Sequence, residues 1–103
     1  MDSDSEEVDL SPEEQEAQNR LLQALERART ISMTLNYVEH LLNPEKPYTP
    51  GMNTPSVRAL LNEVNPGKTV ETRRDAIRKL QEKLAIANKE YEEAIKEAEK
   101  FSR

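Results

Sequence analysis

Apolar side chains recur every three or four residues along two long stretches of the chain. The first series comprises Leu21, Ala24, Ala28, Ile31, Leu35, Val38 and Leu42. The second comprises Val70, Arg73, Ile77, Leu80, Leu84, Ala87, Tyr91, Ala94, Ala98 and Phe101, with Arg73 as its one polar member. Alternation of three and four is typical of helices that bury one stripe against each other, as in a coiled coil. The pattern predicts two long helices over residues 12–42 and 70–101.

Helix start and stop signals support these boundaries. Ser11 followed by Pro12 is a favourable cap and first helical position, and Glu14 suits the acidic position of a capping box. Pro44, Pro47, Pro50 and Pro55 interrupt the helical pattern, so neither long helix continues through the connector of residues 43–54. The prolines at 44, 47 and 50 are also spaced for a polyproline helix, which leaves a binding motif and a plain joint as alternatives.

A short third helix follows the connector. Thr54 and Pro55 repeat the cap-and-proline signal, and four apolar residues then share one helical face: Val57, Leu60, Leu61 and Val64. Asn65-Pro66-Gly67 is a turn by composition. We therefore predict a helix over 55–64 that docks on Met33, Tyr37 and Leu41, a second apolar stripe of the first helix.

The two long helices have nearly equal lengths, which favours one antiparallel pair. The expected fold class is all-α: an antiparallel, coiled-coil-like hairpin over residues 11–103 with a short helix in the connector. Residues 1–10 contain mostly acids and serines and too few apolar groups to offset ordering entropy. They are expected to form a disordered acidic tail.

Charge is distributed unevenly along the 103 residues. The net charge is -5, yet residues 1–19 alone hold eight acids and no base, so the remainder carries +3. The acidic end is interpreted either as a regulatory contact, in which phosphorylation of Ser3 would add negative charge, or as a plain solubilising terminus. Arg74, Arg78, Lys79 and Lys83 make the later helix locally basic and give an alternative nucleic-acid contact.

The end of the hairpin away from the connector is rich in alanine and has no third helix. Large apolar residues flank the seam there without an evident partner in the chain: Leu22, Leu25, Ile86 and Ile95. We predict that they contact a protein partner, in a hetero-complex or a homo-oligomer. The favoured function is a non-catalytic interaction subunit, an adaptor or assembly factor. The alternative is a nucleic-acid-associated protein that uses the four basic residues above under control of the acidic tail.

Signals for chemistry are sparse. The sequence has no Cys, one His at position 40 and no glycine-rich phosphate loop, so we expect no enzyme, cofactor, metal or small-molecule substrate. His40 is expected to support the last carbonyls of its helix. No apolar run approaches a membrane span, and the acidic start is unlike a signal peptide. A cytoplasmic or nuclear location is expected.

One short motif has a counterpart elsewhere. Gly51-Met52-Asn53-Thr54-Pro55, followed by a helix with Arg73 and Arg74, resembles the helical hairpin that precedes the PDZ domain in a proteasomal-ATPase assembly chaperone. The resemblance covers these few residues, and the aspartate-rich segment that follows the motif in that family is missing here. No functional residue is therefore carried over.

Overall fold

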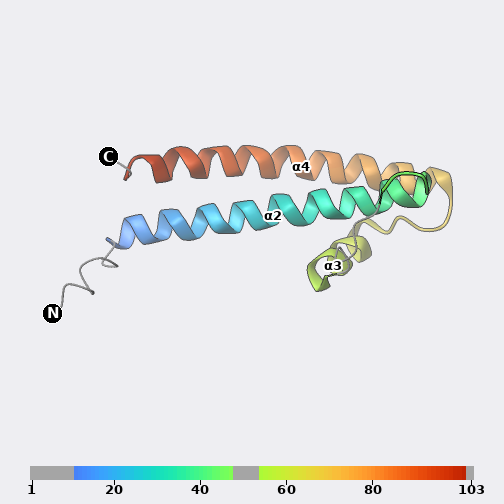
Figure 1. The fold of residues 1–103 in the computed structure, drawn as a ribbon, viewed down its shortest axis with the longest axis horizontal. Helices are drawn as coiled ribbons and strands as arrows, with labels where there is room; N and C mark the ends of the chain where they lie inside the picture. The colour runs from blue at the N-terminus through green and yellow to red at the C-terminus, as the bar shows by residue number, and fades with distance from the viewer. Residues whose placement is uncertain (1–10, 48–53, 102–103) are drawn as a thin grey trace.

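The computed structural model describes residues 11–47 and 54–101, which form three helices (Figure 1). Helix α2 spans Pro12–Leu42, α3 spans Pro55–Val64 and α4 spans Val70–Glu99. Helices α2 and α4 lie side by side in opposite directions, and α3 packs chiefly against α2. The predicted antiparallel hairpin with a short third helix is confirmed. The acidic tail and residues 48–53 of the connector, including Pro50, lie outside the described residues.

Each helix begins at a residue whose side chain accepts a backbone hydrogen bond. Ser11 Oγ accepts from the Glu14 N–H at 3.1 Å, and Thr54 Oγ1 accepts from the Val57 N–H at 3.2 Å, as the sequence predicted. Thr69 and Thr72 form a reciprocal capping box at the start of α4, which the sequence did not reveal. Because the first four N–H groups of a helix have no partner within it, these local bonds determine where each helix begins.

The turn into α4 requires two left-handed residues. Asn65 ends α3 with φ 48°, and its N–H donates to the Leu61 carbonyl at 2.8 Å. Gly67 has φ 65°, and a Cβ built there would lie 2.8 Å from Thr72 Oγ1. A glycine is therefore needed at this position both for its backbone conformation and for space.

The core of the hairpin is a layer of residues spaced seven apart on each long helix. On both helices the side chains of this layer are almost fully buried: Ala17, Ala24, Ile31 and Val38 on α2, and Leu80, Ala87 and Ala94 on α4. The predicted apolar residues between them, such as Leu21, Leu35 and Leu84, are only half-buried. One of the two alternating rows thus points into the seam, and the other leans towards one side of the hairpin.

The ends of the second apolar series depart from the prediction. Val70 and Phe101 remain 55% and 39% exposed, because they lie at or beyond the ends of the α2–α4 contact, and α4 ends at Glu99 rather than at residue 101. Ala17, Thr34 and Ala76 are buried although they were outside the predicted seam. The Thr34 hydroxyl is satisfied inside α2, since it donates to the Thr30 carbonyl at 2.7 Å.

Helix α3 completes the core at the connector end. Its Val64 belongs to one apolar cluster with Ile31, Val38 and Leu80, with Leu60 and Leu61 packed at the edge. Val57 is also buried, whereas Met33, Tyr37 and Leu41 are half-buried. The sequence placed Val64 on the apolar face of α3, and in the structure Val64 belongs to the core cluster of the hairpin.

Arg73, the polar member of the second series, has a definite structural role. Its guanidinium donates to the Leu41 carbonyl at 3.0 Å and to the Gly67 carbonyl at 3.3 Å. Leu41 belongs to the last turn of α2, where carbonyls lack partners within the helix. Arg73 therefore ties the end of α2 to the turn that precedes α4.

We predict that Leu80→Ala lowers the free energy of unfolding by about 2–5 kcal/mol, because the side chain is 0% exposed and its loss leaves a cavity. Urea denaturation followed by circular dichroism measures this change. The control, Glu82→Ala, alters an exposed residue close to Leu80 and should shift stability by less than about 0.5 kcal/mol. Equal effects of the two substitutions would contradict the described core.

A second prediction concerns Arg73→Leu, which keeps an apolar stem but removes both carbonyl bonds. Loss of these partners should cost about 1–3 kcal/mol of unfolding free energy in the same assay. The matched control is Arg74→Leu, since Arg74 is exposed on the adjacent position. A larger loss for the control would show that Arg73 does not join the two helices.

Candidate protein-interaction surface

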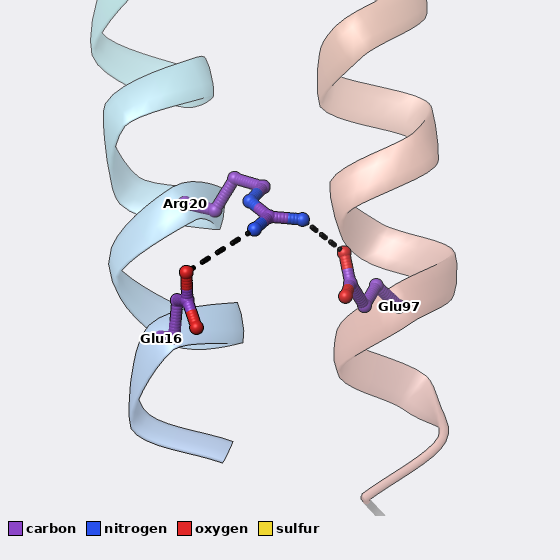
Figure 2. A network of polar contacts seen from close by, with 3 residues as sticks. All are labelled: Glu16, Arg20 and Glu97. Carbon is purple, nitrogen blue, oxygen red and sulfur yellow. Dashed lines mark hydrogen bonds and ion pairs between the residues drawn. The ribbon is translucent and has the colours of Figure 1, made fainter. Parts of the chain in front are cut away.

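Two ion pairs set the register between the long helices. Arg20 Nη1 lies 2.7 Å from Glu97 Oε1, and Arg27 Nη1 lies 3.1 Å from Glu90 Oε1. Figure 2 shows that Arg20 also points a second nitrogen at Glu16, 3.5 Å away on the same helix. These pairs are largely exposed, so each stabilises the fold by less than about 1 kcal/mol. Their value here is geometric, since they show which residues of α2 and α4 lie at the same level along the hairpin.

The same ion pairs mark one of the two long faces of the hairpin, which we call the groove face. It contains a shallow hollow of about 650 Å³ whose apolar floor includes Ile31, Leu60 and Ile86. A second hollow of about 360 Å³ continues towards the open end past Ala24 and Ala94. Helix α3 contributes to the first hollow and is linked to α4 by Lys83 Nζ, 3.0 Å from Glu63 Oε2.

Charged side chains rim the groove face. Three cations and five carboxylates line the two hollows: Arg20, Arg27, Lys83, Glu26, Glu63, Glu90, Glu93 and Glu97. All three cations are already paired with carboxylates across the hollows. An apolar partner on this face would have to displace water from these charges.

The opposite long face has a different character, and we call it the back face. At 100° per residue, ten positions of α2 and α4 project to this side. They are Leu21, Leu25, Ala28, Ser32, Leu35, Gln81, Leu84, Asn88, Tyr91 and Ile95. None of these ten carries a charge, although 34% of the chain's residues do. The large apolar members are half-buried by the hairpin itself, so part of each remains accessible.

The structure separates the four predicted contact residues. Leu25 and Ile95 lie on the back face, and Leu22, 59% exposed, lies at its outer edge. Ile86, 61% exposed, lies on the groove face instead. Its position cannot be inferred without knowing which side of α4 meets α2. The uncharged residues between them, such as Ser32 and Asn88, were missed because apolarity was the only signal considered.

The four basic residues of α4 do not form one surface. At 100° per residue, Arg74 and Lys83 lie roughly 180° apart around the helix. Asp75 forms ion pairs with Arg78 and with Lys79, the latter at 3.3 Å, and Lys83 is held by Glu63. Three of the four cations are thus partly neutralised by neighbouring carboxylates.

Among residues 11–47 and 54–101, no group of three or more histidine or acidic side chains could hold a metal ion. His40 Nδ1 donates to the Lys46 carbonyl at 2.8 Å, so it ties the last turn of α2 to the start of the connector. No helix in this part of the chain has the length and apolarity needed to cross a bilayer.

Comparison with known proteins adds no relative from which a role could be transferred. No family model matches the chain, and neither does any curated protein or solved structure. The contrast between its two long faces is therefore the feature from which a function must be argued.

Proposed function

We propose that this protein is a non-catalytic interaction subunit, an adaptor or assembly factor, that binds other helices through its back face. The observation that carries the proposal is the uncharged stripe over residues 21–35 and 81–95. A helix face exposed only to water in so charged a chain would be expected to carry lysine and glutamate. Depletion of charge at the centre of a surface is the compositional signature of a protein interface.

The stripe also offers enough apolar surface to support binding. Its six large apolar residues are Leu21, Leu25, Leu35, Leu84, Tyr91 and Ile95. Because each is already half-buried, covering what remains contributes roughly 1 kcal/mol per side chain at about 25 cal/mol per Å². The sum is comparable with the gross apolar contribution of a modest helix-in-groove contact.

The architecture of the open end supports the same proposal. The seam there is made of Ala17, Ala24, Ala87 and Ala94, which bury little apolar area. Helix α3 completes the core only at the connector end, through Val64. A partner on the back face would supply at the open end the third layer that the chain lacks.

The lack of cysteine fits a reducing compartment, so we place this interaction in the cytoplasm or nucleus.

The proposal is tested by affinity purification of the tagged full chain from its source cells. Leu25→Asp combined with Ile95→Asp should abolish recovery of bound protein, because each adds a charge to the uncharged stripe. The matched control, Gln23→Asp with Ile86→Asp, alters nearby levels of the same helices on the groove face and should retain binding. Circular dichroism must show that both variants stay helical. Loss in the control but not in the back-face variant would contradict the proposal.

Nucleic-acid association through Arg74, Arg78, Lys79 and Lys83 is the alternative function. The ion pairs to Asp75 and Glu63 weigh against it, because binding phosphate would compete with these carboxylates. We predict no binding to a DNA or RNA duplex at low salt, either with the full chain or after deletion of residues 1–10. The alternative instead requires affinity that falls steeply with salt, with a logarithmic slope of about -0.9 per phosphate contacted on DNA.

A further inference from the structure

We propose that the occupant of the back face is a second copy of this chain, so that two hairpins form a symmetric four-helix bundle. The inference rests on the proposed function, since it identifies the partner of the same face. It follows from three properties of that face: the direction in which its residues point, its lack of charge and the register set by the ion pairs.

The uncharged side chains of α2 point in the directions expected for a helix that packs against two neighbouring helices. In a two-helix pair each helix buries one narrow stripe, whereas in a four-helix bundle each buries a wider one that faces two partners. In this hairpin the row containing Ala24 and Ala87 fills the contact within the pair and is fully buried. The adjacent rows, represented by Leu21 and Leu25, extend the uncharged surface about 100° around α2, the width that a second layer of helices requires.

The lack of charge makes this face self-complementary. In a two-fold dimer each surface patch meets its own copy, so a patch with net charge of one sign repels itself. The hollows of the groove face, lined by more carboxylates than cations, have that defect. The back face does not, because its ten residues are neutral.

The register of the hairpin then determines which residues at the edges of the back face lie opposite each other in the two copies. The ion pairs place Arg20 level with Glu97 and Arg27 level with Glu90. A two-fold axis parallel to the helices would set α2 of one copy against α4 of the other at the same levels and in opposite directions. Leu22 of one copy then faces Ile95 of the other, Asn36 faces Gln81, and Glu39 faces Arg78.

These level-matched pairs are chemically compatible. Leu22, exposed in the single hairpin, gains an apolar neighbour. Asn36 and Gln81 can exchange amide hydrogen bonds, and Glu39 meets an opposite charge. Within each chain Arg78 is also paired with Asp75 and Glu39 with Lys46, so this contact would extend two existing ion pairs at the edge of the face. No level between Leu22 and Asn43 brings two like charges together.

The test uses the purified full chain, which has no natural cysteine. Sedimentation equilibrium should give twice the 11.8 kDa chain mass at micromolar concentrations. Leu22→Cys and Ile95→Cys are then prepared as separate proteins. Under mild oxidation an equimolar mixture should form disulfide-linked dimers, whereas each variant alone should not, because identical positions lie at opposite corners of the bundle. The control mixture of Gln23→Cys and Glu93→Cys, which lie at adjacent levels on the groove face, should also stay unlinked.

Substitutions then test the contacts themselves. Leu25→Gln with Ile95→Gln should weaken dimerisation on the order of tenfold or more while the helix content is unchanged. Glu39→Arg should weaken it as well, whereas Lys46→Ala, which removes only the ion pair that Glu39 forms within its own chain, should not. Glu39→Arg combined with Arg78→Glu should restore dimerisation, because the reversed pair again has opposite charges.

The outcomes separate this inference from the function on which it rests. A monomer at every concentration, or linkage of Leu22→Cys to itself, overturns the proposed dimer. Another outcome is that the protein is a monomer while the Leu25 and Ile95 substitutions abolish capture of a bound protein in the affinity purification. In that case the back face binds a different polypeptide, and the interaction function stands. If those changes affect neither self-association nor capture of a partner, both proposals fail.

Discussion

Close approach of α2 and α4 along an alanine layer is the constraint on which the rest of the structure depends. Ala17, Ala24, Ala87 and Ala94 are small enough for two backbones to pack tightly, and all four are buried. Because alanine buries little apolar area, that contact by itself provides modest stability. Residues of the adjacent row, such as Leu21, are turned away from the centre of the seam and stay half-buried. They lean to one side and create the apolar stripe of the back face.

The two ends of the hairpin compensate in different ways for the small apolar area that the alanine layer buries. At the connector end the seam contains Ile31, Val38 and Leu80, and Val64 of α3 joins them in one cluster. Arg73 adds a polar tie between the turn and the last carbonyls of α2. At the open end the chain provides exposed ion pairs in place of a third helix (Figure 2). The connector end is thus a complete small core, whereas the open end has an alanine seam and no third helix to cover it.

Charge is divided between the faces in a way that the hairpin geometry makes possible. Residues one position apart on a helix point about 100° apart, so a single sequence can alternate neutral and charged faces. On the groove face, cations and carboxylates pair with each other across the α2–α4 seam and between α3 and α4. On the back face the same levels carry leucine, tyrosine, serine and amides. Binding through the back face therefore desolvates few charges, which is the physical basis of the proposed function.

Local chemistry determined the elements of this protein, and the contact between helices determined its surfaces. Caps at Ser11 and Thr54, proline breaks and apolar periodicity predicted three helices closely, because these signals act within a few residues. Periodicity could not say which of two alternating rows would be buried, since that depends on how a partner helix is rotated about the seam. Leu25 and Ile95 therefore share a face, whereas Ile86, chosen on the same apolar criterion, lies across the hairpin from them. The role of Arg73 was equally hidden, because the Leu41 carbonyl it binds lies 32 residues away in sequence and meets it only when the chain has folded.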